Sequence, residues 1–405
     1  MSEPAPARTL VRSIGFTTLV LYGLGTIIGA GIYVLVGEVA GAAGMRTPLA
    51  FAVAGVLAAL TGLSYAELTA RHPAAEGTVA FVQAAFGRRW LSRLVGAALG
   101  VVLLTGAATI ALGGAGYLAA AVPAPVPVIA ASVVVLFTGI ACLRVKNSAS
   151  TAAIMSAIEL GGIAFVFAVG SPALAHLPAN LPAMIPAGSS EALGLLAGTF
   201  IAFFAFLGFE SMANMAEETH DPGHTMPRAI LAAIAISAVL YAGVALVTVL
   251  DVPLAELATS ASPLLLVVTR HAPQFSTAFQ AVAVIATLNG VLIEILVVAR
   301  LGYGMAARGH LPHWFGTLHA TTHAPVRTTL VVGAILMALV TVVPFSLLAR
   351  VTSGITLAIF VAVNLSLWTL QRREPRPELT TRVPHWVPLA GAAACGLLLA
   401  GSVLG

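Results

Sequence analysis

Long runs without a charged residue constrain this chain more than any other feature. The 50 residues between Arg93 and Arg144 contain no Asp, Glu, Lys or Arg. A helix needs about 20 apolar residues to cross the hydrocarbon core of a bilayer. Only 8% of the chain is charged, whereas soluble domains carry about 25% charged residues. The sequence therefore predicts an all-α polytopic membrane protein and excludes an ordinary soluble enzyme.

The uncharged runs predict eleven membrane spans. A proline-rich turn at 122–127 divides the longest run into the third and fourth spans. The other nine are expected within 13–37, 47–66, 148–170, 192–215, 229–250, 276–306, 328–349, 351–371 and 384–404. Residues 1–12 then form a short N-terminal tail. No long hydrophilic stretch is left to form a soluble enzymatic domain.

The basic residues orient these spans. If the N-terminus is cytoplasmic and the loops alternate, only Arg46, Arg270 and Arg350 lie outside. The inside set comprises Arg8, Arg12, Arg71, Arg88, Arg89, Arg93, Arg144, Lys146, Arg228, Arg300, Arg308, Arg327, Arg372, Arg373, Arg376 and Arg382. Such a bias toward the cytoplasmic loops is typical of proteins in the cell membrane, and it places the C-terminus outside. The net charge of +4 is thus a topology signal, and no nucleic-acid partner is expected.

Glycines crowd the middle of the first span and recur in the sixth. Gly23, Gly25, Gly29 and Gly31 lie within nine residues, and each glycine lowers helix propensity by about 1 kcal/mol relative to alanine. Gly208 lies in the middle of the sixth span. Two interpretations remain open: glycines allow helices to pack closely, or the helices unwind locally. Unwound backbone is tolerated in a membrane only where it is buried or lines a cavity.

The first and sixth spans are five spans apart, which is the offset expected for two inverted five-helix repeats. A matched pair of glycine-interrupted spans is the best sequence indication of a transporter's central site. The N-terminus of a half-helix attracts an anionic group, and freed carbonyl oxygens accept hydrogen bonds from a cation. The pattern therefore favours a zwitterionic small-molecule substrate.

Four segments resemble one known family. The stretches GTIIGAGIY (25–33), 203–230, 286–312 and 353–375 resemble the first, sixth, eighth and tenth helices of the amino acid–polyamine–organocation transporter superfamily. The 203–230 segment is the most specific, especially toward the cationic amino acid transporter branch. The match covers roughly residues 11–376.

The resemblance implies a leucine-transporter-like fold with rocking alternating access. Its two repeats would span 13–170 and 192–371, and 384–404 would form an eleventh helix. The substrate carboxylate would face Ile27, Gly29, Ala30 and Gly31 in the first span. Phe206, Leu207 and Gly208 would offer carbonyls to the substrate ammonium, with Phe206 as a gate.

Four carboxylates lie within or at the edges of the expected spans. A charge near the middle of a membrane helix costs about 2.5–3.5 kcal/mol on insertion scales, so each requires an explanation. Glu67 precedes Arg71 by four residues, which favours an ion pair at the cytoplasmic edge. Glu210 shares a predicted helical face with Asn214 and Glu217. This polar face either bonds to basic residues of the inner gate or takes part in proton coupling or gating. Glu294 in the eighth span either forms a buried structural hydrogen bond to a neighbouring helix or takes part in transport.

Glu159 in the fifth span is the most informative of these carboxylates. Some sodium-independent members of the family carry a lysine near this place, and that lysine is thought to carry the coupling proton. Here the residue is a glutamate, with no basic residue in the span. Burial disfavours the charged form of a carboxyl group, so Glu159 is a candidate for proton coupling. Recognition of a cationic substrate, a bound cation or a purely structural hydrogen bond are the alternatives.

Other signals do not predict catalysis. His310, His313, His319 and His323 follow the eighth span, but Pro312 breaks the helical register and no carboxylate or cysteine joins them, so no metal site is predicted. The chain has no phosphate-binding loop and no nucleophile motif. No cofactor and no obligate protein partner are expected, and the chain is not expected to be an enzyme.

The sequence thus predicts a sodium-independent, proton-coupled symporter or exchanger for amino acids or related amines. A transporter of polyamines or other organic cations is the alternative. A channel, a non-transporting sensor in the same fold and an intramembrane enzyme are further alternatives. An intramembrane enzyme requires paired catalytic residues on facing helices, and the sequence shows no such pair.

Overall fold

A computed structural model describes residues 14–72, 77–143, 149–307, 312–319, 324–374 and 382–404. Side chains are not described at 29, 30, 149–154, 214, 217, 307, 403 and 404. The tail at 1–12 and the basic residues Arg8, Arg12, Arg144, Lys146, Arg308 and Arg376 lie outside the described residues. The described chain is helical apart from its loops and one isolated pairing of Ile14 with Thr219.

Each of the eleven expected spans coincides with helical structure. The helices are α1 (Phe16–Ala43), α2 (Thr47–Arg71), α4 (Arg89–Ala119), α5 (Val126–Ala141), α6 (Ala149–Gly170), α8 (Ser189–Phe203), α9 (Pro222–Asp251), α12 (Ser276–Ala307), α13 (Val326–Val342), α14 (Phe345–Arg373) and α15 (Trp386–Leu404). The described residues contain seven helices that are long and apolar enough to cross a membrane. Parts of the remaining expected spans, among them α5, α13 and most of α15, are shorter apolar helices. The chain is a multi-pass membrane protein, and the count of eleven spans stays a prediction.

Further short helices lie between the long helices, and two of them, η3 and η4, belong to the sixth span. The α-helical ones are α3 (Gly77–Phe86), α7 (Leu177–Met184), α10 (Leu254–Thr259) and α11 (Pro263–His271). The 3₁₀ helices are η1 (Gly44–Arg46), η2 (Ser171–His176), η3 (Phe204–Phe206), η4 (Phe209–Glu218), η5 (Pro273–Phe275) and η6 (His313–Gly316). The charge-free runs did not predict the short helices that lie outside the expected spans.

The boundary between α13 and α14 differs from the expected one. We expected a loop at Arg350, but the extended residues are Val343 and Pro344. A proline disfavours the helical conformation of the residue before it, which explains why α13 ends there. Arg350 therefore lies on the second turn of α14.

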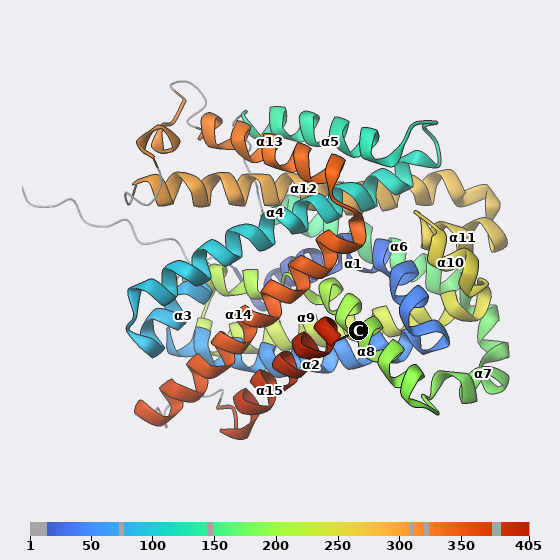
Figure 1. Ribbon diagram of the computed structural model, residues 1–405, viewed down its shortest axis with the longest axis horizontal. Coiled ribbons are helices and arrows are strands. Elements are labelled where there is room, and N and C mark those ends of the chain that lie inside the picture. Colours follow the sequence, from blue (N-terminus) through green and yellow to red (C-terminus); the bar gives the residue numbers. More distant parts are fainter. Residues whose placement is uncertain are drawn as a thin grey trace, which may run out of the picture.

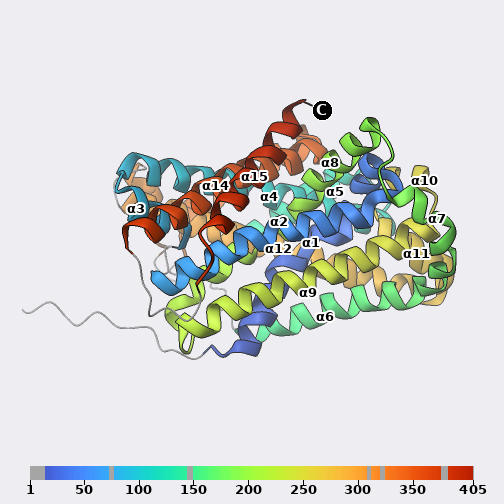
Figure 2. The same ribbon diagram turned by 90° about the horizontal axis from the view of Figure 1, so that it is seen from below.

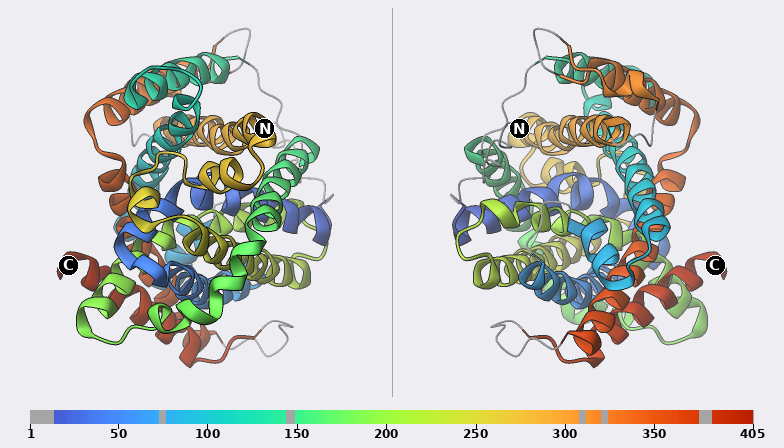
Figure 3. Two further views of the ribbon diagram at one scale, coloured as in Figure 1. Left: turned by 90° about the vertical axis from the view of Figure 1, so that its right-hand side faces the viewer. Right: turned by 90° about the vertical axis from the view of Figure 1, so that its left-hand side faces the viewer.

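Spans that are five apart pack against each other. Helix α2 packs on α9, α4 on α12 and α5 on α13, while α1 packs on α8, η3 and η4. Figure 1 shows α5 and α13 side by side at one edge, and Figure 3, which looks along the long axis, shows the same pair together. Figure 2 shows α1 in the interior, beside α2 and α9. The first four spans thus each contact their counterpart in the second half of the chain.

The first and sixth spans run antiparallel along their whole length. Four contacts along them pair Ala43 with Gly198, Gly31 with Ala205, Thr26 with Gly208, and Gly23 with Met212. Beyond these contacts, the Ile14 N–H donates to the Glu218 carbonyl at 3.0 Å. A glycine forms each of the four contacts, which lets the two segments approach closely.

The sixth span is interrupted, as expected, but the first is not. Helix α8 ends at Phe203, Leu207 is extended, and Gly208 has a φ of 122°. Helix α1 is continuous from Phe16 to Ala43, so of the two interpretations of its glycines local unwinding is wrong and close packing holds. The reason is close packing: Gly25 lies against Ser156 of α6, and Gly31 lies against the backbone of Ala205. These contacts outweigh the low helix propensity of glycine.

Candidate functional site

The break in the sixth span lies directly against α1. A Cβ atom at Gly208 would collide with the carbonyl oxygen of Thr26, and its positive φ is a conformation that only glycine adopts readily. A Cβ atom at Gly31 would lie 2.6 Å from the Cα of Ala205. No side chain fits at either glycine, so the backbones of the two spans are in direct contact there. We call this region, formed by residues 26–31 of α1 and 205–208 of the sixth span, the crossing.

The structure brings together the candidate residues of both spans. Ile27 and Phe206 are 2% and 0% exposed, and Leu207 is half-buried. Gly31 and Gly208 complete the crossing. Gly29 and Ala30 belong to α1, but their side chains lie outside the described ones. The crossing is closed to solvent at Ile27 and Phe206 in this conformation.

Tyr241 of α9 ties the two spans together at this level. Its hydroxyl donates toward the carbonyl oxygens of Ile27 at 2.8 Å and Ala205 at 3.0 Å. The ring of Phe206 packs edge-on against the Tyr241 ring, with the centroids 5.1 Å apart. Sequence reasoning missed Tyr241; the one available signal was a tyrosine in the middle of an apolar span.

Glu210 is bonded to the break itself. Its Oε2 accepts a hydrogen bond from the Gly208 N–H at 2.9 Å. The expected stripe of Glu210, Asn214 and Glu217 assumed an α-helix, but η4 is a 3₁₀ helix. With 3.0 residues per turn, backbone positions four apart are rotated by about 120°, so the α-helical register that the expected stripe assumed does not hold in η4. The side chains of Asn214 and Glu217 lie outside the described ones.

Glu159 of α6 is buried without a hydrogen-bond partner for one of its oxygens. The residue is 1% exposed, and its Oε2 has no partner in the described part of the chain. The Glu159 carbonyl accepts the Tyr33 hydroxyl at 2.7 Å, and the Tyr33 carbonyl accepts the Tyr117 hydroxyl at 2.6 Å. These tyrosines connect α6, α1 and α4 near the crossing. A buried polar atom without a partner calls for a functional or structural explanation.

Glu294 of α12 lies in a different contact. Its Oε2 also has no hydrogen-bond partner among the described residues. The carboxylate occupies the space that Gly106 of α4 leaves open, since a Cβ atom there would lie 3.1 Å from Oε2. Glu294 is therefore packed between α12 and α4.

Glu67 forms the ion pair with Arg71 that the spacing predicted. Its Oε1 accepts from Arg71 Nε at 2.9 Å and Nη2 at 2.6 Å. Its Oε2 accepts from Gln371 Nε2 at 3.0 Å and from the Val383 N–H at 2.7 Å. Because the two charged side chains are only 1% and 5% exposed, this buried network joins α2, α14 and the segment before α15. Its position supports a structural role.

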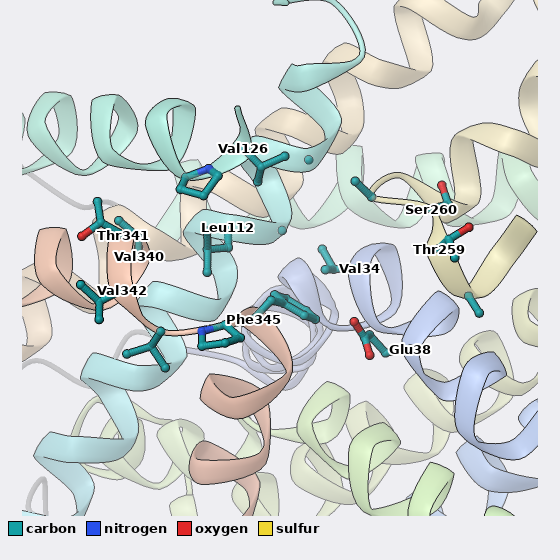
Figure 4. Close-up of a pocket in the computed structure, with 17 residues that line it drawn as sticks. Val34, Glu38, Leu112, Val126, Thr259, Ser260, Val340, Thr341, Val342 and Phe345 are labelled. Carbon is teal, nitrogen blue, oxygen red and sulfur yellow. The ribbon is translucent and has the colours of Figure 1, made fainter. Parts of the chain in front are cut away.

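A cavity of about 440 Å³, shown in Figure 4, lies at the end of the helix bundle opposite the Glu67–Arg71 network. It begins at Val34, about one turn beyond Gly31, and does not include the residues of the crossing. Glu38 lines it. Sequence reasoning missed Glu38 because the expected first span ended at Gly37.

The histidine-rich loop is only partly described. His313 and His319 are described, whereas His310 and His323 are not. Within the described ranges, no group of three His, Cys, Asp or Glu residues is placed to hold a metal ion.

Comparison with known proteins identifies the family. A family model for amino acid permeases matches residues 14–404. An uncharacterized transporter of Mycobacterium tuberculosis is 32% identical over 96% of this chain and 86% of its own length. The methylthioribose transporter of Bacillus subtilis is 26% identical over 98% of this chain and 89% of its own. A cationic amino acid transporter of Arabidopsis thaliana is 29% identical over 91% of this chain and 64% of its own.

These relatives are named as transporters, and the match extends over nearly the whole chain. The resemblance seen in the four sequence segments is thereby confirmed, and the chain carries amino acids or related compounds across a membrane. This protein belongs to the amino acid permease family, within the amino acid–polyamine–organocation superfamily.

Proposed function

We propose that this protein is a secondary active transporter that binds its solute between α1 and the broken sixth span. The observation that carries this proposal is the crossing itself, where Gly208, which follows the extended Leu207, lies against the backbone of Thr26 and Ile27. The break interrupts the regular backbone hydrogen bonding at mid-span, where such backbone is tolerated only in a buried or cavity-lining position. Backbone carbonyls there suit an ammonium group.

Alternating access follows from two inverted five-helix repeats, 13–170 and 192–371, with 384–404 as an eleventh helix. Support comes from the contacts of α2 with α9, α4 with α12 and α5 with α13, and from the antiparallel first and sixth spans. Each pair joins a span to its counterpart five positions later. Rocking one repeat-derived bundle against the other would expose the crossing to either side.

We further propose that Glu159 provides sodium-independent coupling to protons. Its buried Oε2, which has no hydrogen-bond partner in the part of the chain that the structure describes, lies on the helix that contacts Gly25 of α1 through Ser156. A carboxyl group in this setting exchanges a proton only when the crossing opens to water. Glu210 would sense the same event, because protonation changes how its Oε2 accepts from the Gly208 N–H. Glu294 is the third candidate for coupling.

In this proposal the solute is an amino acid or a related amine. The protein lies in the cell membrane, with its N-terminus in the cytoplasm and its C-terminus outside. An organic-cation or polyamine exchanger is the second candidate. The carboxyl group of Glu159 favours that candidate, since its Oε2 has no hydrogen-bond partner among the described residues and would match a second positive charge on the solute. A relative named as a cationic amino acid transporter supports the same direction.

Solute counterflow in proteoliposomes tests the function. Vesicles loaded with one unlabelled solute are diluted into trace labelled solute, over a panel of neutral and cationic amino acids and polyamines. Alternating access predicts a transient, saturable accumulation of label for the matching solute. A linear, non-saturating flux would indicate a channel, and the absence of flux with the whole panel would contradict the proposed transport.

A further inference from the structure

The cavity of Figure 4 is separate from the crossing and has the dimensions of a small-molecule site. Its volume of about 440 Å³ falls in the range of about 300–1,000 Å³ that is typical of ligand pockets. Its walls come from α1, α4, the start of α5, the end of α10 with the following residues 260–261, and the junction of α13 with α14. All of these parts lie at the end that the predicted orientation places outside.

The lining combines apolar walls with a single charge. Among the 17 residues that line the cavity, Glu38 is the only Asp, Glu, Lys or Arg. Val34, Leu112 and Phe345 supply apolar surface, and Figure 4 shows the Glu38 side chain near the Phe345 ring. A carboxylate in a cleft with low-dielectric walls concentrates cations at its mouth.

Glu38 differs from the other carboxylates at this end of the described chain. Glu191 pairs with Arg46, Glu256 with Arg270, and Asp251 with His271. Glu38 forms none of the ion pairs found among the described residues. Arg350 lines a smaller adjoining cavity together with Glu38 and attracts its carboxylate electrostatically, but these two described side chains form no ion pair. The carboxylate is thus left available to a cation from solution.

We propose that this cavity is an outer loading site, in which Glu38 binds the ammonium group of an amine with an apolar body. The inference rests on the proposed function, because it supplies the solute to the crossing. Glu38 and Gly31 lie seven residues apart on α1, a helical rise of about 10 Å. A solute held at Glu38 is therefore one short step from the crossing.

Charge-selective labelling tests the site without relying on transport. In a Cys142→Ser background, Thr341→Cys places a thiol on the cavity wall, and a cationic and an anionic methanethiosulfonate of similar size are compared. Glu38→Gln should lower the ratio of cationic to anionic reaction rates by about threefold or more. Glu38→Asp should keep the ratio, and Glu191→Gln, a carboxylate at the same end but outside the cavity lining, should leave it unchanged. An equal ratio in Glu38→Gln and its parent would overturn the proposal.

Protection from labelling identifies the solute chemistry. L-Lysine and L-leucine should slow the labelling of Thr341→Cys. Isocaproate, which lacks the amino group, should not slow it. In Glu38→Gln the protection by the two amino acids should be lost. In vesicles, Glu38→Gln should raise the half-saturating concentration of the transported solute while sparing the maximal rate. If uptake is normal but amines give no protection, the loading site is wrong. If amines protect but nothing is transported, the loading site stands and the transport proposal fails.

Discussion

The hydroxyl oxygen of Tyr241 lies 2.8 Å from the carbonyl oxygen of Ile27. The same hydroxyl lies 3.0 Å from the carbonyl of Ala205, so one proton serves one carbonyl from each of the two crossing spans. A solute ammonium group that binds these carbonyl oxygens must share them with the Tyr241 hydroxyl or replace its hydrogen bond. Tyr241 therefore positions the backbone of the proposed site in its closed form.

Tyr241→Phe should loosen this arrangement while keeping the ring that packs on Phe206. We expect the half-saturating solute concentration to change by about fivefold, which corresponds to roughly 1 kcal/mol. Tyr117→Phe is the matched control, because its buried hydroxyl also donates to a carbonyl of α1, but to that of Tyr33 rather than to that of Ile27 or Ala205. Each variant should lose about 1 kcal/mol of stability. Equal transport kinetics in the two variants would show that Tyr241 is only structural.

The Glu67–Arg71 pair should matter for stability far more than an exposed pair does. Glu67→Gln removes one charge of a buried pair, and we expect a loss of about 3 kcal/mol in the free energy of unfolding. Glu256→Gln breaks the pair with Arg270, whose side chains are 44% and 37% exposed, and should cost about 1 kcal/mol or less. Denaturant titration of the purified protein in detergent compares the two. Similar losses would refute a structural role for the buried network.

Glu159→Gln separates proton coupling from recognition of a cationic solute. Glutamine keeps the size of the side chain and much of its hydrogen bonding but cannot ionise. Under coupling, the variant should still exchange solute but lose accumulation driven by a pH gradient. Under recognition, it should lose affinity for cationic solutes and keep it for neutral ones. Wild-type affinity, selectivity and pH response in the variant would make Glu159 structural; Glu191→Gln controls for the loss of a surface carboxylate.

Transport should not depend on sodium. The resemblance places an ionisable side chain, Glu159, at the part of the fifth span where sodium-coupled relatives supply hydroxyl ligands. Replacing sodium by choline on both sides of proteoliposomes should therefore leave the initial rate of uptake unchanged. A rate that rises steeply with sodium concentration would reverse this conclusion.

The positions of the long helices could be predicted because hydrocarbon requires about 20 apolar residues for each span. Charge-free runs therefore located all eleven helical segments. The helix boundary at Pro344 was misplaced because hydropathy does not distinguish a proline turn inside an apolar stretch from a continuous span. The short helices α10 and α11 depend on tertiary packing rather than on membrane length, so the same signal missed them.

The candidate site was predictable only in part. Gly208 indicated the break correctly, because it sits beside Glu210 in an otherwise apolar span. The glycines of α1 were ambiguous, since the same residues allow unwinding or close packing, and only the neighbours Ser156 and Ala205 decide between them. Tyr241 was missed because its role depends on two carbonyls that are distant in sequence.

In our proposal the solute passes through the crossing of α1 with the break at Gly208, and the initial rate of uptake by Gly208→Ala tests this passage. Alanine at a φ of 122° costs about 1–3 kcal/mol of strain, and its Cβ atom would press on Thr26. Gly304→Ala is the control, because its Cβ atom would meet no neighbour. Gly31→Ala provides a second probe of the same crossing if Gly208→Ala does not fold. We predict that the folded variants Gly208→Ala and Gly31→Ala lose about tenfold or more in uptake rate, which corresponds to a barrier higher by about 1.4 kcal/mol. Gly304→Ala should keep the wild-type rate. Wild-type uptake by folded, membrane-inserted Gly208→Ala and Gly31→Ala would contradict the account.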